Sequence, residues 1–212
     1  MRKQKFLSNM IAIIDYKAGN ITSVRLGCEA VGAVAEITSD PAVIRAASHV
    51  IFPGVGAAGY AMDKLRESEL IPVINECLAA DKPFLGICLG TQILFEHSEE
   101  DGGVPTLGIF PGKVKKFIPQ SRADKIPHMG WNQAKQRYAH PLLAGVPDNA
   151  DFYFVHSYYT EPALESDIVC TTNYCGIEFT SMVGRGKVAA TQFHIEKSGK
   201  YGLQILKNFA NI

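Results

Sequence analysis

Glycines lie two residues before and two residues after Cys88, directly behind an apolar run that begins at Phe84. The segment reads Gly86-Ile87-Cys88-Leu89-Gly90, a spacing typical of a sharp turn between a buried strand and a helix. Larger side chains at the two glycine positions would collide with the strained, exposed residue at the turn. The segment therefore predicts an α/β fold in which Cys88 lies at the carboxyl end of a central strand, where open α/β sheets bind their ligands.

The first hundred residues alternate short apolar runs with amphipathic segments, as in a mostly parallel sheet. Strands are expected over 10–14, 34–38, 49–52 and 84–87. Helices are expected over 21–31 behind an Asn20 N-cap, from the Asp40-Pro41 cap onward, and over 61–65, 70–78 and 89–95.

After about Gly102 the sequence changes to short β-branched or aromatic runs separated by Gly, Pro and Asn. These predict strands over 113–118, 151–155, 168–172, 179–183 and 188–193, a hairpin turn over 184–187 and a closing amphipathic helix over 200–209. We expect one α/β domain over 10–212, with an open, mostly parallel central sheet flanked by helices. The added antiparallel strands of the second half would bring His194 back beside Cys88.

Composition removes several classes of function. Lys plus Arg and Asp plus Glu both total 21, so no overall field attracts the chain to nucleic acid or to a membrane. The five cysteines form no CxxC pair, which suggests neither a disulfide framework nor a metal site and favours a cytoplasmic location. No cofactor is predicted.

The basic start of the chain is followed by an apolar run that ends at Asp15 and is too short for a secretory signal. We interpret residues 1–9 as an N-terminal extension that need not be native, with Met10 as the start of the fold. No stretch approaches the ~20 apolar residues that span a bilayer.

Three residues predict acyl-transfer chemistry. His194 and Glu196 are two apart, so on extended backbone the carboxylate can hold one ring nitrogen and leave the other for a nucleophile. Cys88 at a helix N-terminus beside a histidine favours a reactive thiolate. Cys88 would attack a carbonyl, His194 would protonate the leaving nitrogen, and water would release the acyl group. The alternatives are a cysteine that packs as a small apolar side chain and a surface His–Glu pair.

An oxyanion hole needs N–H donors aimed at the developing charge. Two neighbouring strand ends offer them, namely the N–H of Leu89 and an N–H from Gly54-Val55-Gly56. The alternative is a plain strand-to-helix turn. A phosphate loop is not supported, because no Gly-Lys-Ser/Thr follows the second glycine.

Seven short segments carry a family resemblance. They are 14–16 (Ile-Asp-Tyr) with 18–20 (Ala-Gly-Asn), 53–56 (Pro-Gly-Val-Gly), 86–92 (Gly-Ile-Cys-Leu-Gly-Thr-Gln), 127–132 (Pro-His-Met-Gly-Trp-Asn), 153–158 (Tyr-Phe-Val-His-Ser-Tyr) and 192–194 (Gln-Phe-His). From Met10 onward the chain is similar to class I (triad) glutamine amidotransferases. Within that class, segments 127–132 and 153–158 resemble the glutaminase subunits of imidazole glycerol phosphate synthase, from histidine biosynthesis.

The resemblance implies that glutamine is hydrolysed to glutamate at Cys88, His194 and Glu196. The same resemblance implies that the substrate is bound by Gln92 and by the backbone near His156, Ser157 and Tyr158.

It also implies a heterodimer with a (β/α)₈-barrel cyclase subunit, which joins the ammonia to a phosphoribulosyl-formimino intermediate. Met129, Trp131, Asn132 and Lys197 would lie near this partner, and the 53–56 loop would turn its N–H inward only when the barrel is occupied. The alternatives are that Met129 and Trp131 belong to the core and that Lys197 is a solvated charge.

Three positions depart from the family pattern, which usually has proline at Ile195, glycine at Lys17 and methionine at Thr91. Ile195 frees a backbone angle that proline would fix, so a looser Glu196 could slow the reaction. Three other functions stay open: an amidotransferase serving another pathway, a Cys-elbow hydrolase or stress protein of similar topology, and a catalytically silent regulatory subunit.

Overall fold

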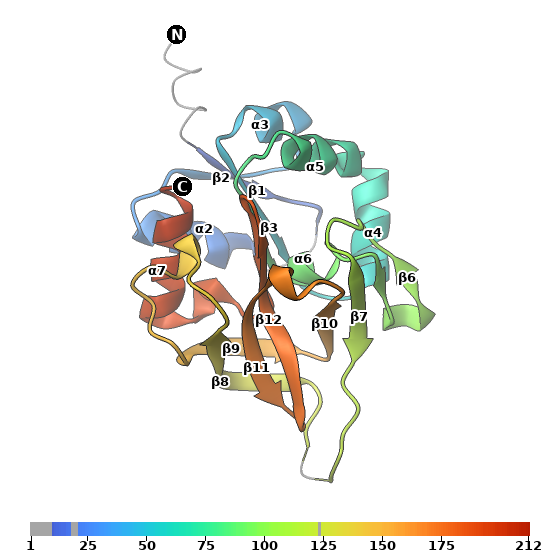
Figure 1. Ribbon diagram of the computed structural model, residues 1–212. Coiled ribbons are helices and arrows are strands. Elements are labelled where there is room, and N and C mark those ends of the chain that lie inside the picture. The colour runs from blue at the N-terminus through green and yellow to red at the C-terminus, as the bar shows by residue number, and fades with distance from the viewer. Residues whose placement is uncertain (1–9, 18–20, 123) are drawn as a thin grey trace.

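The computed structural model describes residues 10–17, 21–122 and 124–212 (Figure 1). Its central layer is a parallel sheet with the strand order β2-β1-β3-β4-β13. These strands are β1 (Ile11–Ile14), β2 (Ala35–Thr38), β3 (His49–Gly54), β4 (Phe84–Cys88) and β13 (Val188–Thr191). The prediction of an open, mostly parallel sheet is confirmed. The predicted extension over 1–9 and the Asn20 cap lie outside the described residues.

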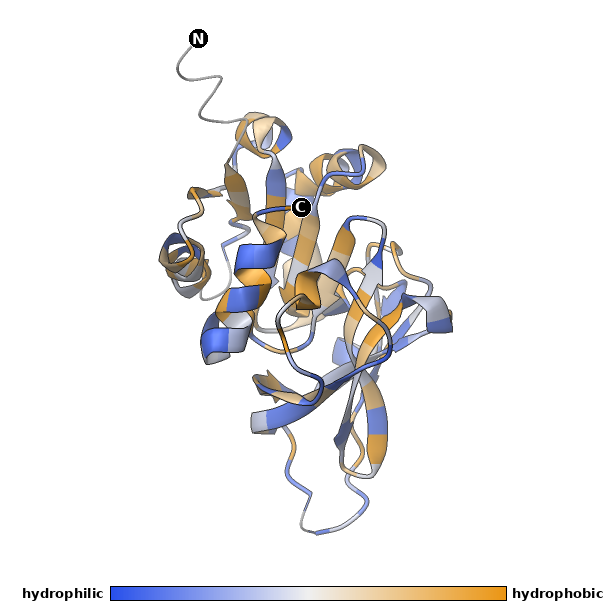
Figure 2. Cartoon of the chain, turned by 60° about the vertical axis from the view of Figure 1, so that its left-hand side comes forward, coloured by the Kyte–Doolittle hydropathy of each residue, from blue (hydrophilic) through white to orange (hydrophobic). Residues whose placement is uncertain are grey.

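Helices cover both faces of this sheet, as they must when strands are apolar on both sides. One face packs on α2 (Ile21–Ala30) and α7 (Gly199–Phe209), the other on α3 (Pro41–Ala46), α4 (Ala58–Glu67) and α5 (Leu70–Ala79). Alternate residues of β1 therefore enter different hydrophobic clusters: Ile13 shares one with Leu206 of α7, and Ile14 shares the other with Leu65 of α4. Figure 2 shows hydrophilic and hydrophobic residues alternating along α7, as this one-sided burial requires.

The second half extends the sheet with mostly antiparallel strands. The order continues from β13 through β12 (Ile177–Arg185), β10 (Tyr158–Pro162), β7 (Gly112–Lys116), β5 (His97–Ser98) and β6 (Val104–Pro105). A branch pairs β12 with β11 (Ile168–Tyr174), then β8 (His128–Gln136) and β9 (Ala150–His156). Single 3₁₀ turns are η1 (Glu100–Gly102), η2 (Pro141–Leu143), η3 (Glu165–Asp167) and η4 (Ile195–Lys197). The predicted hairpin is confirmed, because Arg185 pairs with Val188 around a two-residue turn.

Strands β8 and β10 were absent from the sequence prediction. In β8 the apolar Met129 and Trp131 face outward, while the polar His128 and Asn132 face inward. In a half-buried strand the apolar residues usually face inward. Because β8 has the opposite arrangement, its alternation of apolar and polar residues did not indicate a strand. In β10 the terminal Pro162 weakens the strand signal.

The predicted helix over 89–95 is wrong, because α6 spans only Leu89–Gln92. Beyond it, the N–H groups of Leu94 and Phe95 donate only three residues back, to Thr91 and Gln92 at 3.2 Å, so the α-helical pattern is not continued. The carbonyls of Ile93 and Leu94 accept from the N–H groups of Leu107 and Ile109 at 2.9 and 2.8 Å, which ties a returning segment to this end of the helix. In the described part of the chain, no helix is long and apolar enough to cross a membrane.

Gly90 lets α6 pack directly on the backbone of β3. A Cβ on Gly90 would lie 1.9 Å from the carbonyl oxygen of Phe52, and a Cβ on Gly86 would lie 2.9 Å from the carbonyl oxygen of Gly90. Neither backbone contact can be relieved by rotating a side chain. The glycines that flank Cys88 are therefore a packing requirement of the sheet.

We predict that Gly90→Ala lowers the free energy of unfolding by about 1–3 kcal/mol or more, because the added methyl forces α6 away from β3. Urea unfolding followed by circular dichroism measures the change. Gly27→Ala is the control: its Cβ would lie 2.8 Å from the flexible tip of Leu206 and at an ordinary 3.8 Å from Glu196, and alanine favours a helix. Equal losses in the two variants would contradict the proposed close packing.

Candidate active site

Cys88 occupies the sharp turn that the sequence predicts. It ends β4 and precedes α6 with φ 56° and ψ −109°, outside the regions that side-chain-bearing residues normally adopt. Strain of this kind marks functional positions when the surrounding packing enforces it, as Gly86 and Gly90 do here. Because α6 has only four residues, its dipole supports a thiolate less than the predicted longer helix would.

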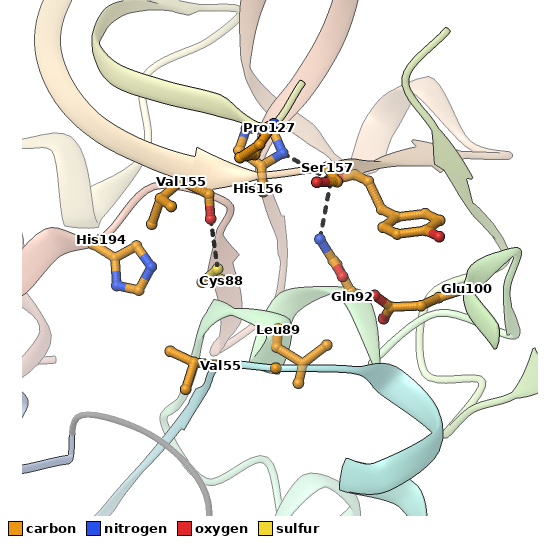
Figure 3. A pocket seen from close by; sticks show the side chains of 12 residues that line it. Val55, Cys88, Leu89, Gln92, Glu100, Pro127, Val155, His156, Ser157 and His194 are labelled. Atoms are coloured by element: carbon orange, nitrogen blue, oxygen red, sulfur yellow. Dashed lines mark hydrogen bonds between the residues drawn. The ribbon is translucent and has the colours of Figure 1, made fainter. Parts of the chain in front are cut away.

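The Cys88 sulfur is held by two polar neighbours. It lies 3.9 Å from the carbonyl oxygen of Val155, to which the thiol donates, and 3.8 Å from Nε2 of Gln192, which donates to the sulfur. Figure 3 shows the His194 ring next to Cys88 at the same end of the pocket. The fold therefore brings the sulfur and the imidazole together from distant parts of the chain.

His194 and Glu196 form the predicted pair, but the backbone conformation between them differs from the predicted one. Nδ1 of His194 lies 2.7 Å from Oε1 of Glu196, and the two side chains are only 4% and 2% exposed. The predicted extended backbone is confirmed at His194, which has φ −84° and ψ 98°, but is wrong beyond it, because Glu196 lies within the 3₁₀ turn η4. Within the described chain, Nε2 of His194 has no hydrogen-bond partner, which leaves this nitrogen available for proton transfer.

The charge on His194 follows from its neighbours. Burial alone lowers the pKa of His194, but Cys88 and Glu196 outweigh burial and raise it to about 10. The His194 ring can therefore carry a second proton beside Cys88 and deliver it to a leaving group.

A pocket of about 340 Å³ opens beside the sulfur (Figure 3). It is lined by Val55, Gly56, Cys88, Leu89, Gln92, Glu100, Pro127, Val155, His156, Ser157, Tyr158 and His194. The substrate-binding residues predicted from the resemblance all lie on this wall. Within the described ranges, no cluster of His, Cys, Asp or Glu that could hold a metal ion is found.

The sequence analysis assigned no role to Glu100, which lines the pocket, or to Gln192, which donates to the Cys88 sulfur. Glu100 accepts a hydrogen bond from the Ala58 N–H at 2.7 Å, and burial raises its pKa above the usual value. The run Glu99-Glu100-Asp101 contains no signal for which carboxylate would face a pocket. Gln192, by contrast, precedes Phe193-His194 in the family motif, so the motif itself could have drawn attention to it.

Gln92 and His156 share one acceptor on the pocket wall. Nε2 of Gln92 donates to the Tyr158 carbonyl at 3.0 Å and to Oε1 of Gln192 at 3.1 Å. Nδ1 of His156 lies 2.7 Å from the same Tyr158 carbonyl. These bonds fix the backbone of residues 156–158 against α6.

The predicted oxyanion donors divide into two groups. Leu89, Val55 and Gly56 line the pocket, and the Leu89 N–H belongs to the first turn of α6, which has no helical acceptor. Gly54 pairs with Cys88 across β3 and β4 but does not line the pocket. A Cβ on Gly54 would lie 2.7 Å from the Tyr16 hydroxyl, so Gly54 makes room behind the pocket.

The predicted partner residues lie on β8 and η4. Met129 and Trp131 are 62% and 57% exposed, so the alternative that they belong to the core is wrong. Lys197 is exposed, and its Nζ lies 5.8 Å from the centre of the Tyr153 ring, which also contacts the Trp131 ring edge-on. Asn132 faces the other way and is hydrogen-bonded inside the protein.

Each of the three residues that depart from the family pattern fits its surroundings in the structure. Ile195 is the first residue of η4, a position where proline is also tolerated, and its buried side chain joins the core. Lys17 has φ 67°, a left-handed conformation that favours glycine. Thr91 donates from Oγ1 to the Thr191 carbonyl at 2.6 Å, which satisfies its buried hydroxyl.

With this geometry in place, comparison with known proteins defines the class. The family model "Glutamine amidotransferase class-I" matches residues 13–212. The chain belongs to the class-I glutamine amidotransferase family.

Relatives narrow the comparison further. The chain is 51% identical over 201 residues to "Imidazole glycerol phosphate synthase subunit HisH" of Nitrosococcus oceani, covering 94% of this chain and 95% of that protein. It is 50% identical over 200 residues to the HisH subunit of Dehalococcoides mccartyi, covering 94% and 96%.

Solved structures share the fold at much lower identity. PurLQS from Thermotoga maritima is 16% identical with a TM-score of 0.76, over 96% of this chain and 98% of that one. A glutamine amidotransferase from the same organism is 18% identical with a TM-score of 0.64, over 88% and 76%. Both confirm the predicted α/β fold class.

We predict that Cys88→Ser lowers the pKa of His194, because the interactions with Cys88 that raise this pKa are lost. NMR titration of the His194 ring measures this, with Cys175→Ser at the β11–β12 turn as the control. A folded-state pKa above the ordinary 6.5 stabilises the protein fully below about pH 6.5, and this stabilisation is lost as the pH rises through about 10. An unchanged His194 pKa in Cys88→Ser would contradict the pairing.

Proposed function

We propose that the chain hydrolyses glutamine to glutamate and ammonia through Cys88, His194 and Glu196. The observation that carries this proposal is the strained Cys88 turn next to an imidazole that Glu196 holds at 2.7 Å and whose Nε2 is unpaired in the described chain. This arrangement supplies a nucleophile, a proton carrier and an orienting carboxylate, as covalent acyl transfer requires.

The reaction proceeds in two stages. The Cys88 sulfur attacks the side-chain amide carbon of glutamine, and the resulting oxyanion accepts hydrogen bonds from the Leu89 N–H and from an N–H of the 54–56 loop. Nε2 of His194 donates its proton to the amide nitrogen, the C–N bond breaks, and ammonia leaves a thioester on Cys88. His194 then takes a proton from water, whose oxygen attacks the thioester and releases glutamate.

The pocket matches the charges of glutamine. The Glu100 carboxylate is the negative group on its wall and suits the α-ammonium group of an amino acid. Gln92 and the backbone of His156, Ser157 and Tyr158 hold the remainder of the substrate. With about 340 Å³ available, the pocket has the size of a site for a small metabolite.

The names of the relatives support a particular pathway. We propose that the chain is the HisH-type glutaminase subunit of imidazole glycerol phosphate synthase in histidine biosynthesis. In this role it forms a heterodimer with a (β/α)₈-barrel cyclase, which uses the ammonia to make imidazole glycerol phosphate and aminoimidazole carboxamide ribotide. Residues 10–212 act as one domain in the cytoplasm.

The exposed apolar face of β8 supports such a partner. Met129 and Trp131 present large apolar side chains to solvent beside Lys197, a combination typical of protein interfaces. A closed interface is chemically useful, because ammonia released into water at neutral pH is mostly protonated and lost as a nucleophile. A role in another amidotransferase pathway would change this partner and leave the glutaminase chemistry unaltered.

We predict that the chain releases glutamate from glutamine, and that a cyclase barrel with its nucleotide ligand increases the rate. Cys88→Ala should lower the rate about 10⁴-fold or more, because the nucleophile is lost. A coupled glutamate assay measures both effects. Release that Cys88→Ala leaves unchanged would refute the assigned nucleophile, whereas a failure to respond to the barrel would favour another pathway.

We predict that Glu100→Gln raises the KM for glutamine about tenfold with little change in kcat, because a charged contact to the α-ammonium is lost. Steady-state kinetics measure this split. Glu99→Gln is the matched control, since Glu99 is the exposed neighbour outside the pocket lining. Equal effects of the two substitutions would argue against the assigned role of Glu100.

A further inference from the structure

The side chains of two buried histidines take no chemical step in the proposed reaction: His156 lines the pocket, and His128 contacts His156 from outside the lining. The His128 ring stacks between Phe154 and Tyr174, with ring centres 4.7 and 3.8 Å away. Burial lowers the pKa of His128 to about 4 and that of His156 to about 3. Both rings are therefore neutral at neutral pH, and each carries a single N–H.

Hydrogen bonding determines which nitrogen carries that proton. Nδ1 of His156 lies 2.7 Å from the Tyr158 carbonyl oxygen, which can only accept, so Nδ1 must be protonated. The neutral ring then has a bare Nε2, which lies 3.0 Å from Nδ1 of His128. Nδ1 of His128 must therefore be the donor, and its Nε2 is bare in turn.

Asn132 completes the chain at the other end. Its Nδ2 lies 3.2 Å from Nε2 of His128 and also donates to the Asn173 carbonyl at 3.0 Å. Its Oδ1 accepts the Gln133 N–H at 2.8 Å, which fixes the orientation of the amide. Every donor in the chain thus points from β8 toward Tyr158, and the order cannot reverse because the last acceptor is a carbonyl.

The same carbonyl connects this chain to the nucleophile. Tyr158 also accepts from Gln92, whose second N–H reaches Gln192 at 3.1 Å. Gln192 then donates to the Cys88 sulfur at 3.8 Å. The hydrogen bonds are continuous from the inner side of β8 to the active sulfur.

We propose that Asn132, His128 and His156 form a one-directional hydrogen-bond relay that positions the pocket wall at Tyr158 and, through Gln92 and Gln192, the Cys88 sulfur. These are positioning residues, and their kinetic effect rests on the proposed glutaminase function. Because Asn132 alternates along β8 with the exposed Met129 and Trp131, the relay ties the outer face of that strand to the glutamine pocket.

The relay can be tested without measuring enzyme activity. Nitrogen NMR of the ¹⁵N-histidine-labelled full chain at pH 6 should show both His128 and His156 as neutral Nδ1–H tautomers. A Nε2–H tautomer or a charged ring at either residue would overturn the proposal, whether or not the chain hydrolyses glutamine.

Asn132→Asp tests the positioning role. The aspartate has nearly the same shape but places an acceptor against the bare Nε2 of His128, so the ring must change its protonation. We expect kcat/KM for glutamine, measured with saturating cyclase barrel, to fall about 10–100-fold, because small misplacements near a reacting centre cost this much.

Gln133→Glu is the matched control, because it adds the same charge one residue along on the exposed side of β8. It should leave both tautomers unchanged and kcat/KM within about twofold. Unaltered kinetics in Asn132→Asp, despite a changed His128 ring and an intact fold by circular dichroism, would overturn the positioning role. An inactive wild-type chain would instead refute the proposed glutaminase function, while the tautomers would still decide whether the relay exists.

Discussion

The close contact between α6 and the backbone of β3 is the constraint on which the site depends. Gly90 allows it, since any side chain there would overlap the Phe52 carbonyl. The chain must leave β4 and enter α6 within one residue, so Cys88 takes φ 56°. Its sulfur is thereby directed to the carboxyl edge of the sheet, where Val155, Gln192 and His194 converge. The proposed nucleophile is placed by backbone packing, and its strain is supported by the whole parallel sheet.

Burial has opposite consequences for the histidines of this region. His194 is buried against Glu196 and beside Cys88, so its pKa rises and the ring can hold a proton. His128 and His156 are buried among aromatic rings, and their pKa values fall. The first can transfer protons, while the other two can act only as fixed donors and acceptors. A negative neighbour therefore makes the difference between the histidine proposed to transfer protons and the two proposed to position the pocket wall, because it raises the pKa that burial lowers.

Predictions from the sequence succeeded where a local rule governed the structure. The Cys88 turn follows from two glycines, the Asp40 cap from an Asp-Pro pair, and the 184–187 hairpin from a glycine-rich turn. Predictions failed where distant segments decided the outcome. The helix after Cys88 ends at Gln92, and the carbonyls of residues 93–95 accept hydrogen bonds from the distant segment 107–110. Strand β8 was missed because its polar residues face inward to a histidine pair that no local pattern reveals.

The sequence by itself determined the alternation of strands and helices, the nucleophile turn and the pairing of His194 with Glu196, because each depends on residues close together in the chain. Only the tertiary structure decided that Glu100 and Gln192 belong to the site and that His194 caps a 3₁₀ turn. It alone also aligned Asn132, His128 and His156. The physical reason is that burial and hydrogen-bond partners are set by segments far apart in sequence, which meet only when the sheet has formed.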